Sequence, residues 1–139
     1  MAALEKYGLP LNTDFIVECL NCNEEEGYKQ AISLFSKEEK ADAIFCVNDE
    51  MAIGALSALR HLNLNVPNDV GVVGFSNSTA GRYMNPSLTS IEQSGEEIGK
   101  TATEILIQTI NNENNIGSTF IQNVIEPILI IRESSNRAI

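Results

Sequence analysis

Two patterns of apolar positions follow one another along the chain and predict strands and helices in turn. Short apolar runs at residues 15–19, 43–47 and 70–75 are typical of buried strands. Between them, apolar residues recur three and four positions apart, which predicts helices with one buried face over about 23–35 and 49–62. The sequence therefore predicts a regular succession of strand and helix.

The order of strand, helix and strand within residues 41–93 predicts an α/β fold with a parallel sheet flanked by helices. Strands that are apolar throughout belong to sheets that helices cover on both faces. In such sheets ligands bind beyond the carboxyl ends of the strands. Those ends carry Asn48-Asp49 and Ser76-Asn77, so we expect a polar binding cleft there.

The second half of the chain has fewer apolar runs and more turn residues. Ser94 followed by Glu97 has the spacing of a capping box, which predicts the start of a helix that ends near Asn111. The chain opens with what looks like the last turn of a helix, so we expect it to be a piece of a longer protein. The remaining predicted segments are a loop with room for one helical turn at 76–87, an extended stretch at 88–93, a polar loop at 111–118, strands at 119–122 and 124–131, and a tail from 132 to 139.

Composition excludes several classes of function. With 139 residues the chain is about one domain, and its net charge of −10 argues against nucleic-acid binding by this piece, because phosphate neutralisation needs clustered Lys and Arg. It has no apolar run long enough to span a membrane and no recognisable signal peptide. Three cysteines at low density favour a reducing cytoplasm over a disulfide scaffold.

Catalytic and metal-binding motifs are weak. Cys19 and Cys22 form a C-x-x-C after a predicted strand and before a helix, which is the context of a thiol–disulfide oxidoreductase, but the acidic run 24–26 disfavours a thiolate. A zinc site would need two more ligands, and only Cys46 and His61 remain for that purpose. We therefore expect no enzyme, no metal and no cofactor, and keep the oxidoreductase as a remote alternative.

Five segments, in order, resemble the effector domain of the lactose- and galactose-repressor family of bacterial transcription regulators. The resemblance covers nearly the whole chain, and periplasmic sugar-binding proteins, which share the fold, are the alternative. The matching segments are DAIFCVNDEMAIGAL at 42–56, VPNDVGVVGF at 66–75, RYMNPSLTSIEQ at 82–93, GKTATEIL at 99–106 and IRES at 131–134.

The resemblance implies one lobe of a two-lobed, type I periplasmic-binding-protein-like fold in which the ligand lies between the lobes. It assigns residues 1–88 to the C-terminal lobe and 89–93 to a crossing between lobes. Residues 94–122 would belong to the N-terminal lobe, most of which is absent, and 123–133 would return to the C-terminal lobe before a tail at 134–139. The DNA-binding domain is also absent.

Ligand contacts carry over from the family to four positions of this sequence. Asn48 matches the Asn of the N-D-x-x-A motif and Gln93 ends the crossing strand, and in relatives both contact sugar hydroxyls. Cys22 falls near a position that is often larger and sometimes aromatic. Ser76 stands where relatives carry an Asp that grips two adjacent hydroxyls, and a neutral Ser cannot accept two charge-assisted bonds.

Helix 49–62 carries a second apolar face at Met51 and Ile53, beyond the stripe that faces its own sheet. Relatives pair these lobes about a two-fold axis, so the resemblance implies a homodimer through this face. The sequence thus predicts the sensing and dimerisation part of a cytoplasmic, sugar-responsive transcription regulator. Its partners would be a small-molecule effector of the sugar or sugar-derivative class, a second copy, and operator DNA reached only through the missing domain.

Overall fold

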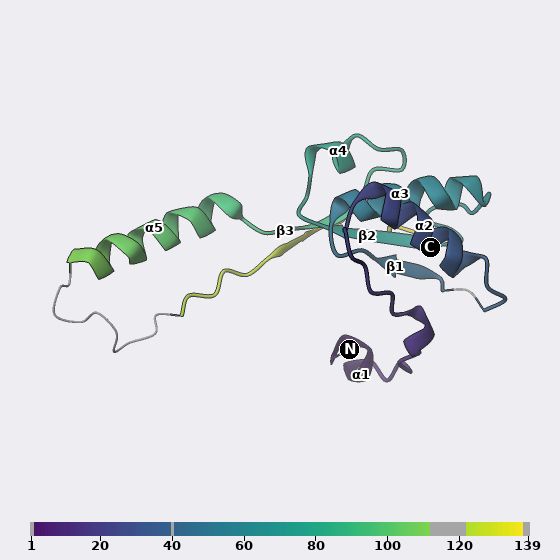
Figure 1. The fold of residues 1–139 in the computed structure, drawn as a ribbon, viewed down its shortest axis with the longest axis horizontal. Coiled ribbons are helices and arrows are strands. Elements are labelled where there is room, and N and C mark those ends of the chain that lie inside the picture. The colour runs from purple at the N-terminus through teal and green to yellow at the C-terminus, as the bar shows by residue number, and fades with distance from the viewer. Residues whose placement is uncertain (1, 40, 112–121, 138–139) are drawn as a thin grey trace.

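The computed structural model describes residues 2–39, 41–111 and 122–137 and shows a compact body with a long arm (Figure 1). The body begins with helix α1 (Ala2–Lys6) and a single 3-10 turn (Thr13–Phe15). Its remaining elements, in chain order, are α2 (Glu24–Phe35), β1 (Ala43–Phe45), α3 (Asp49–His61), β2 (Gly71–Phe75), α4 (Thr79–Arg82), β3 (Thr89–Glu92) and β4 (Ile128–Ile130), with the arm helix α5 (Gly95–Asn111) between the last two.

The four strands form one sheet in the order β1-β2-β3-β4. β1, β2 and β3 run parallel, while β4 pairs with β3 in the antiparallel direction. The register pairs Val73 with Thr89 and Phe75 with Ile91. This mixed sheet confirms the predicted α/β class, and the antiparallel β4 is the strand by which the chain returns from the arm.

Helices α2 and α3 pack on each other and on one face of the sheet, and the core lies beneath them. Their backbones come so close that a Cβ at Gly27 would collide with the backbone of Met51, and a Cβ at Gly54 with the carbonyl oxygen of Glu24. The opposite sheet face is exposed at Phe45, which is 62% exposed and turned away from α2. Helices were expected on both faces, but within the described residues α2 and α3 cover only this one.

The predicted strand at 15–19 is not part of the sheet. Phe15 ends the 3-10 turn, and residues 16–19 run on without strand pairing. An apolar alternation gives a strand only when a neighbouring strand supplies its hydrogen bonds, and the order β1-β2-β3-β4 includes no strand from this segment. The segment lies instead along a cavity beside β1.

Residues 134–137, the described part of the expected tail at 134–139, are anchored to the body. Ser134 is fully buried: its Oγ donates to the Val72 carbonyl at 2.6 Å and accepts from the Thr89 amide at 2.8 Å. The Ser134 carbonyl also accepts from the Val72 amide at 2.8 Å. Further along, Arg137 donates to the Pro67 carbonyl at 2.8 Å, so residues 134–137 hold the edge of the body together.

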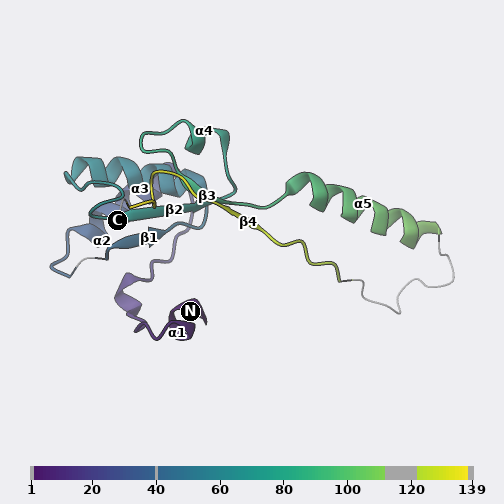
Figure 2. The same cartoon turned by 180° about the vertical axis from the view of Figure 1, so that it is seen from behind.

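Helix α5 leaves the body after β3 and extends well away from it, and the chain returns beside it to β4 (Figure 2). None of its residues is buried, and Leu106 and Ile110 are 59% and 63% exposed. Ser94 has φ of 51°, which is not the extended conformation of an N-cap, so the predicted capping box is replaced by another entry into the helix. The predicted loop at 112–118 and most of the strand at 119–122 lie outside the described residues.

Within the residues that the structure describes, no helix has the length and apolar character needed to cross a bilayer.

Candidate functional site

Three of the four predicted ligand contacts lie at one edge of the sheet. Because β1, β2 and β3 are parallel, the residues that follow them share the same edge. Asn48 comes three residues after β1, Ser76 directly after β2 and Gln93 directly after β3. The side chains of Ser76 and Gln93 are exposed there, whereas Asn48 is half buried. Their contact with a ligand stays a prediction.

Asn48 already has a structural role at this edge. Its Oδ1 accepts from the Met51 amide at 2.9 Å, which makes it the N-cap of α3. Its Nδ2 donates to the carbonyl of Cys22 at 2.7 Å. The side chain therefore ties the start of α3 to the loop before α2, and a ligand would find one free N–H and one oxygen lone pair.

The Cys22 loop is shaped around the carboxylate of Glu26. That carboxylate accepts from the amides of Leu20, Asn21 and Cys22 at 2.9, 2.6 and 3.0 Å, while Cys22 adopts φ of 48°. The bond from Leu20, followed by that from Asn21, holds the pKa of Glu26 below its usual range. The backbone amides of these three residues are thus already hydrogen-bonded to the Glu26 side chain of the same chain.

Ser76 and Asn77 continue β2 in an unusual backbone conformation. Their φ angles are 106° and 49°, in the left-handed region that favours glycine. The Ser76 amide donates to the Ile91 carbonyl at 2.9 Å, so the strained pair is still tied to β3. Strained backbone of this kind persists where the surrounding structure enforces it, and it clusters at binding sites and switches.

Asp49 is a buried carboxylate that sequence reasoning assigned only to a helix start. It is 1% exposed, and its two oxygens accept from the Ser78 amide at 2.5 Å and the Ser90 hydroxyl at 2.6 Å. Gly74 makes room for it, because a Cβ there would collide with its Oδ1. Asp49 therefore joins α3 to β3 and to the loop after β2. The sequence feature that could have indicated this buried carboxylate is the glycine in β2, Gly74, which leaves space for it.

Asn77 was expected only as one of the polar residues at the end of a strand, and the structure gives it a more specific role. It is 8% exposed, its Nδ2 donates to the carboxylate of Glu92 at 2.6 Å, and its Oδ1 accepts from the guanidinium of Arg132 at 2.6 Å. The bond from Asn77 is the first cause that lowers the pKa of Glu92. Arg82 lies 3.9 Å from the same carboxylate.

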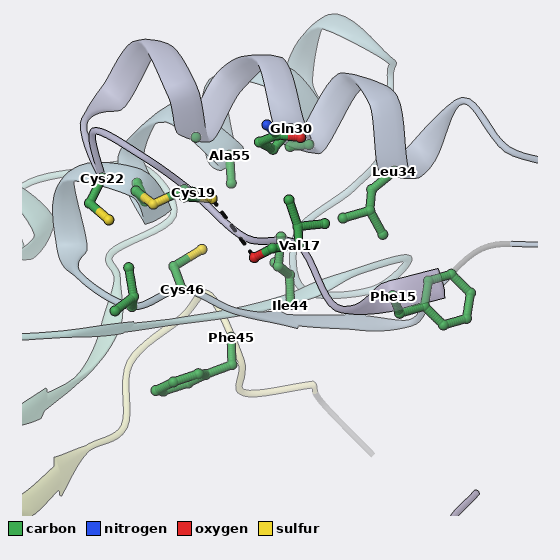
Figure 3. A pocket seen from close by; sticks show the side chains of 14 residues that line it. Phe15, Val17, Cys19, Cys22, Gln30, Leu34, Ile44, Phe45, Cys46 and Ala55 are labelled. Carbon is green, nitrogen blue, oxygen red and sulfur yellow. Dashed lines mark hydrogen bonds between the residues drawn. The ribbon is translucent and has the colours of Figure 1, made fainter. Parts of the chain in front are cut away.

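The three cysteines line one cavity of about 320 Å³ between segment 15–19, α2 and β1 (Figure 3). Burial, followed by the nearby Glu26 and Cys22, raises the pKa of the Cys19 thiol, and burial raises the pKa of Cys46 to about 12. A catalytic thiol of an oxidoreductase needs a lowered pKa, so these values run against that alternative. Among the described residues, no cluster of three or more His, Cys, Asp or Glu side chains could hold a metal ion.

The two residues expected at a dimer interface differ in their surroundings. Met51 is only 6% exposed and lies against Gly27 of α2, so it belongs to the core and offers no surface to another copy. Its position in the first turn of α3 placed it on a second apolar face, and that face is covered by α2. Ile53 is half buried and still reaches the surface.

Comparison with known proteins relates the sequence to one domain family and to transcriptional repressors. The sequence matches the profile of the periplasmic binding protein-like domain over residues 1–135. It is 36% identical over 132 residues to the HTH-type transcriptional repressor PurR of Haemophilus influenzae. The alignment covers 95% of this chain and 39% of that protein. The chain thus spans about two fifths of the length of the curated relatives that it matches.

Solved structures share the fold over the same extent. A putative LacI-family transcriptional regulator from Sanguibacter keddieii superposes with a TM-score of 0.88 at 30% identity, covering 96% of this chain and 50% of that one. The transcriptional regulator CelR in complex with cellobiose gives a TM-score of 0.85 at 29% identity, covering 96% and 40%. The similarity therefore includes the arm as well as the body.

Proposed function

The chain belongs to the periplasmic binding protein-like domain family and is similar to LacI-type transcriptional regulators, and on that premise we propose that it is the effector-sensing part of such a regulator. The observation that carries the proposal is the edge where β1, β2 and β3 end, which presents Ser76 and Gln93 to solvent beside Asn48. In this role the chain binds a ligand and performs no catalysis. Its cytoplasmic location stays a prediction.

The body would be the C-terminal lobe, made of residues 1–88 and 123–133, and residues 94–122 would belong to a second lobe reached through the crossing at 89–93. The arm supports this division, because α5 has no buried residue and carries an apolar stripe. Apolar faces of this kind mark contact sites. The stripe consists of Ile98, Ala102, Ile105, Leu106 and Ile110.

The effector would be a sugar or a related small molecule. Exposed hydroxyl and amide groups at the strand ends suit neutral hydroxyls. The relative whose structure contains cellobiose supports this class of ligand. Ser76 in place of an Asp should weaken the grip on adjacent hydroxyls, and Cys22 contributes a small side chain at its end of the edge. Operator DNA would be contacted by another part of the whole protein, because this piece carries a net charge of −10 and phosphate neutralisation needs clustered Lys and Arg.

Half of the cleft should bind sugar weakly, because small-molecule sites normally bury about 70–90% of their ligand. The test is an NMR titration of the ¹⁵N-labelled chain with cellobiose at millimolar concentration. We expect amide shifts confined to the strand-end edge, at Asn48, Ser76 and Gln93. Gln93→Ala should weaken the apparent affinity by roughly tenfold, the effect of one lost hydrogen bond in a polar site.

The matched control is Gln122→Ala, which removes an equally exposed amide on the returning segment. It should leave the titration unchanged. Absence of shifts with cellobiose and with a panel of monosaccharides, or shifts centred away from the three strand ends, would refute the assignment of the edge. A periplasmic sugar carrier remains the alternative, and the named relatives favour the regulator because one is a transcriptional repressor and the other two are described as transcriptional regulators.

A homodimer would form through the exposed side of α3 and the loop after Phe75. The half-buried Ile53 supports this surface, while Met51 does not contribute to it. Sedimentation of Ile53→Glu should show a shift toward monomer relative to the wild type, and Glu50→Gln, an exposed change on the same helix, should not. Equal sedimentation of Ile53→Glu and wild type would contradict this interface.

A further inference from the structure

The direction of the arm is decided where two strands leave the body. The chain passes from β3 into α5 and returns through β4, and the arm projects from the sheet at this point (Figures 1 and 2). β3 and β4 pair through Ser90 with Ile130 and Glu92 with Ile128. A side chain that holds both strands at their exit would therefore fix the angle between arm and body.

Asn77 is placed to hold both strands at once. Through Nδ2 it binds Glu92, the last residue of β3, and through Oδ1 it binds Arg132, two residues beyond β4, both at 2.6 Å. The backbone N–H of Asn77 also donates to the hydroxyl of Ser90 at 3.0 Å. Each side-chain bond has a charged partner, and such bonds are about twice as strong as neutral ones.

Arg132 extends the same connection into the body. Its other guanidinium nitrogen donates to the Leu88 carbonyl at 2.5 Å, and its amide donates to the Thr89 hydroxyl at 2.8 Å. On the other side, Arg82 of α4 donates to the carbonyl of Asn77 at 3.3 Å. Asn77 is thus bound through its side-chain amide by β3 and by the segment after β4, and through its backbone carbonyl by α4.

Ser76 precedes Asn77 directly and has φ of 106°. The backbone amides of both residues are bonded to β3, that of Ser76 to the Ile91 carbonyl at 2.9 Å and that of Asn77 to the Ser90 hydroxyl at 3.0 Å. We propose that Asn77 is a positioning residue that fixes the direction of the arm and couples it to the ligand-facing Ser76. The coupling to ligand rests on the proposed sensing function, whereas the clamp on β3 and β4 does not.

The clamp can be tested in the 139-residue chain without any ligand. Asn77→Gly removes the bridging amide and is compatible with φ of 49°, so it deletes the clamp without adding backbone strain. Hydrogen exchange measured on peptides that cover 89–92 and 128–130 should accelerate by roughly tenfold or more, because hydrogen bonds to charged groups are lost. Exchange in α3 should stay unchanged.

Asn63→Gly is the matched control, because Asn63 also has a positive φ, of 55°, but is an exposed residue that follows α3 and takes no part in the clamp. It should not accelerate exchange in either peptide. Glu92→Gln keeps an acceptor for Asn77 but removes its charge, so it should give a smaller acceleration than Asn77→Gly and serves if that variant does not fold.

A second readout is the distance between spin labels introduced as unnatural amino acids at Ser57 of α3 and Glu104 of α5, two exposed positions. Asn77→Gly should broaden the distribution of this distance relative to Asn63→Gly. Unchanged exchange and distance would overturn the clamp, as would an equal acceleration in α3, and either result would leave the cellobiose titration as an independent test of the sensing function.

Discussion

Helices α3 and α5 each carry an apolar stripe but have opposite surroundings. Eight of the 13 residues of α3 are buried, between α2 and the sheet, whereas none of the 17 residues of α5 is buried. The contrast shows that an apolar stripe indicates that a helix has a partner without indicating where the partner is. In α3 the partner lies within the same chain, and in α5 we infer that most of it does not.

The largest expected effect is on the body. Asp49→Ala should lower the free energy of unfolding by about 3 kcal/mol, because the buried Ser78 amide and Ser90 hydroxyl lose a charged acceptor. Urea unfolding monitored by circular dichroism measures this. Glu50→Ala, an exposed neighbour in the same turn, is the control and should change stability by less than about 0.5 kcal/mol. A small effect of Asp49→Ala would mean that the body does not depend on this junction.

A smaller effect is expected from acid, again on the body. Hydrogen bonds from Leu20, Asn77 and Ser87 hold the pKa values of Glu26, Glu92 and Glu133 below the usual range. Because the unfolded chain then binds protons more readily, stability is complete above the ordinary Glu pKa of about 4.3 and falls as pH drops below it.

Urea midpoints measured between pH 7 and pH 3 would show this loss. The variant Glu26→Gln should flatten the pH dependence, whereas Glu38→Gln on the exposed loop after α2 should follow the wild type. A steeper dependence in Glu26→Gln would contradict the assignment.

The smallest effect on stability is expected in the arm. Leu106→Lys should change the unfolding free energy of the body by less than about 0.5 kcal/mol, because its side chain is mostly exposed. It should nevertheless reduce concentration-dependent association, since an exposed apolar stripe is a contact site. Light scattering over a range of concentrations would measure this, with Gln108→Lys as the control. A wild-type chain that stays monomeric at high concentration would contradict the inference that the apolar stripe of α5, unlike that of α3, seeks a partner outside the body.

The elements with dense local patterns could be predicted closely. Helix α3 was expected at 49–62 and spans Asp49–His61, and β2 was expected at 70–75 and spans Gly71–Phe75. Their periodicity is a local property, so it can be read without knowing the fold. The prediction of a strand at 15–19 was wrong, because a strand also needs a neighbouring strand to bond with. A local sequence pattern does not show whether such a neighbour is present.

The candidate site divides in the same way. The placement of Asn48 and Ser76 at one edge followed from the parallel order of the strands, and that of Gln93 from the family resemblance, although their roles stay predictions. The bonds of Asn77 reach residues 15 and 55 positions away, to Glu92 and Arg132, and no spacing rule connects such pairs. The sequence therefore indicated the position of the candidate site, but it did not reveal the hydrogen bonds of Asn77 that connect the strands there.

The hydrogen bonds between Val72 and Ser134 bear on how fast this body can fold. Val72 exchanges hydrogen bonds with Ser134, so a central strand obtains part of its bonding from a residue 62 positions further along the chain. Contacts between residues far apart in sequence slow folding, because the intervening chain must be ordered before they form. We therefore expect the completion of β2, which waits for Ser134, to be a late step in the folding of the body.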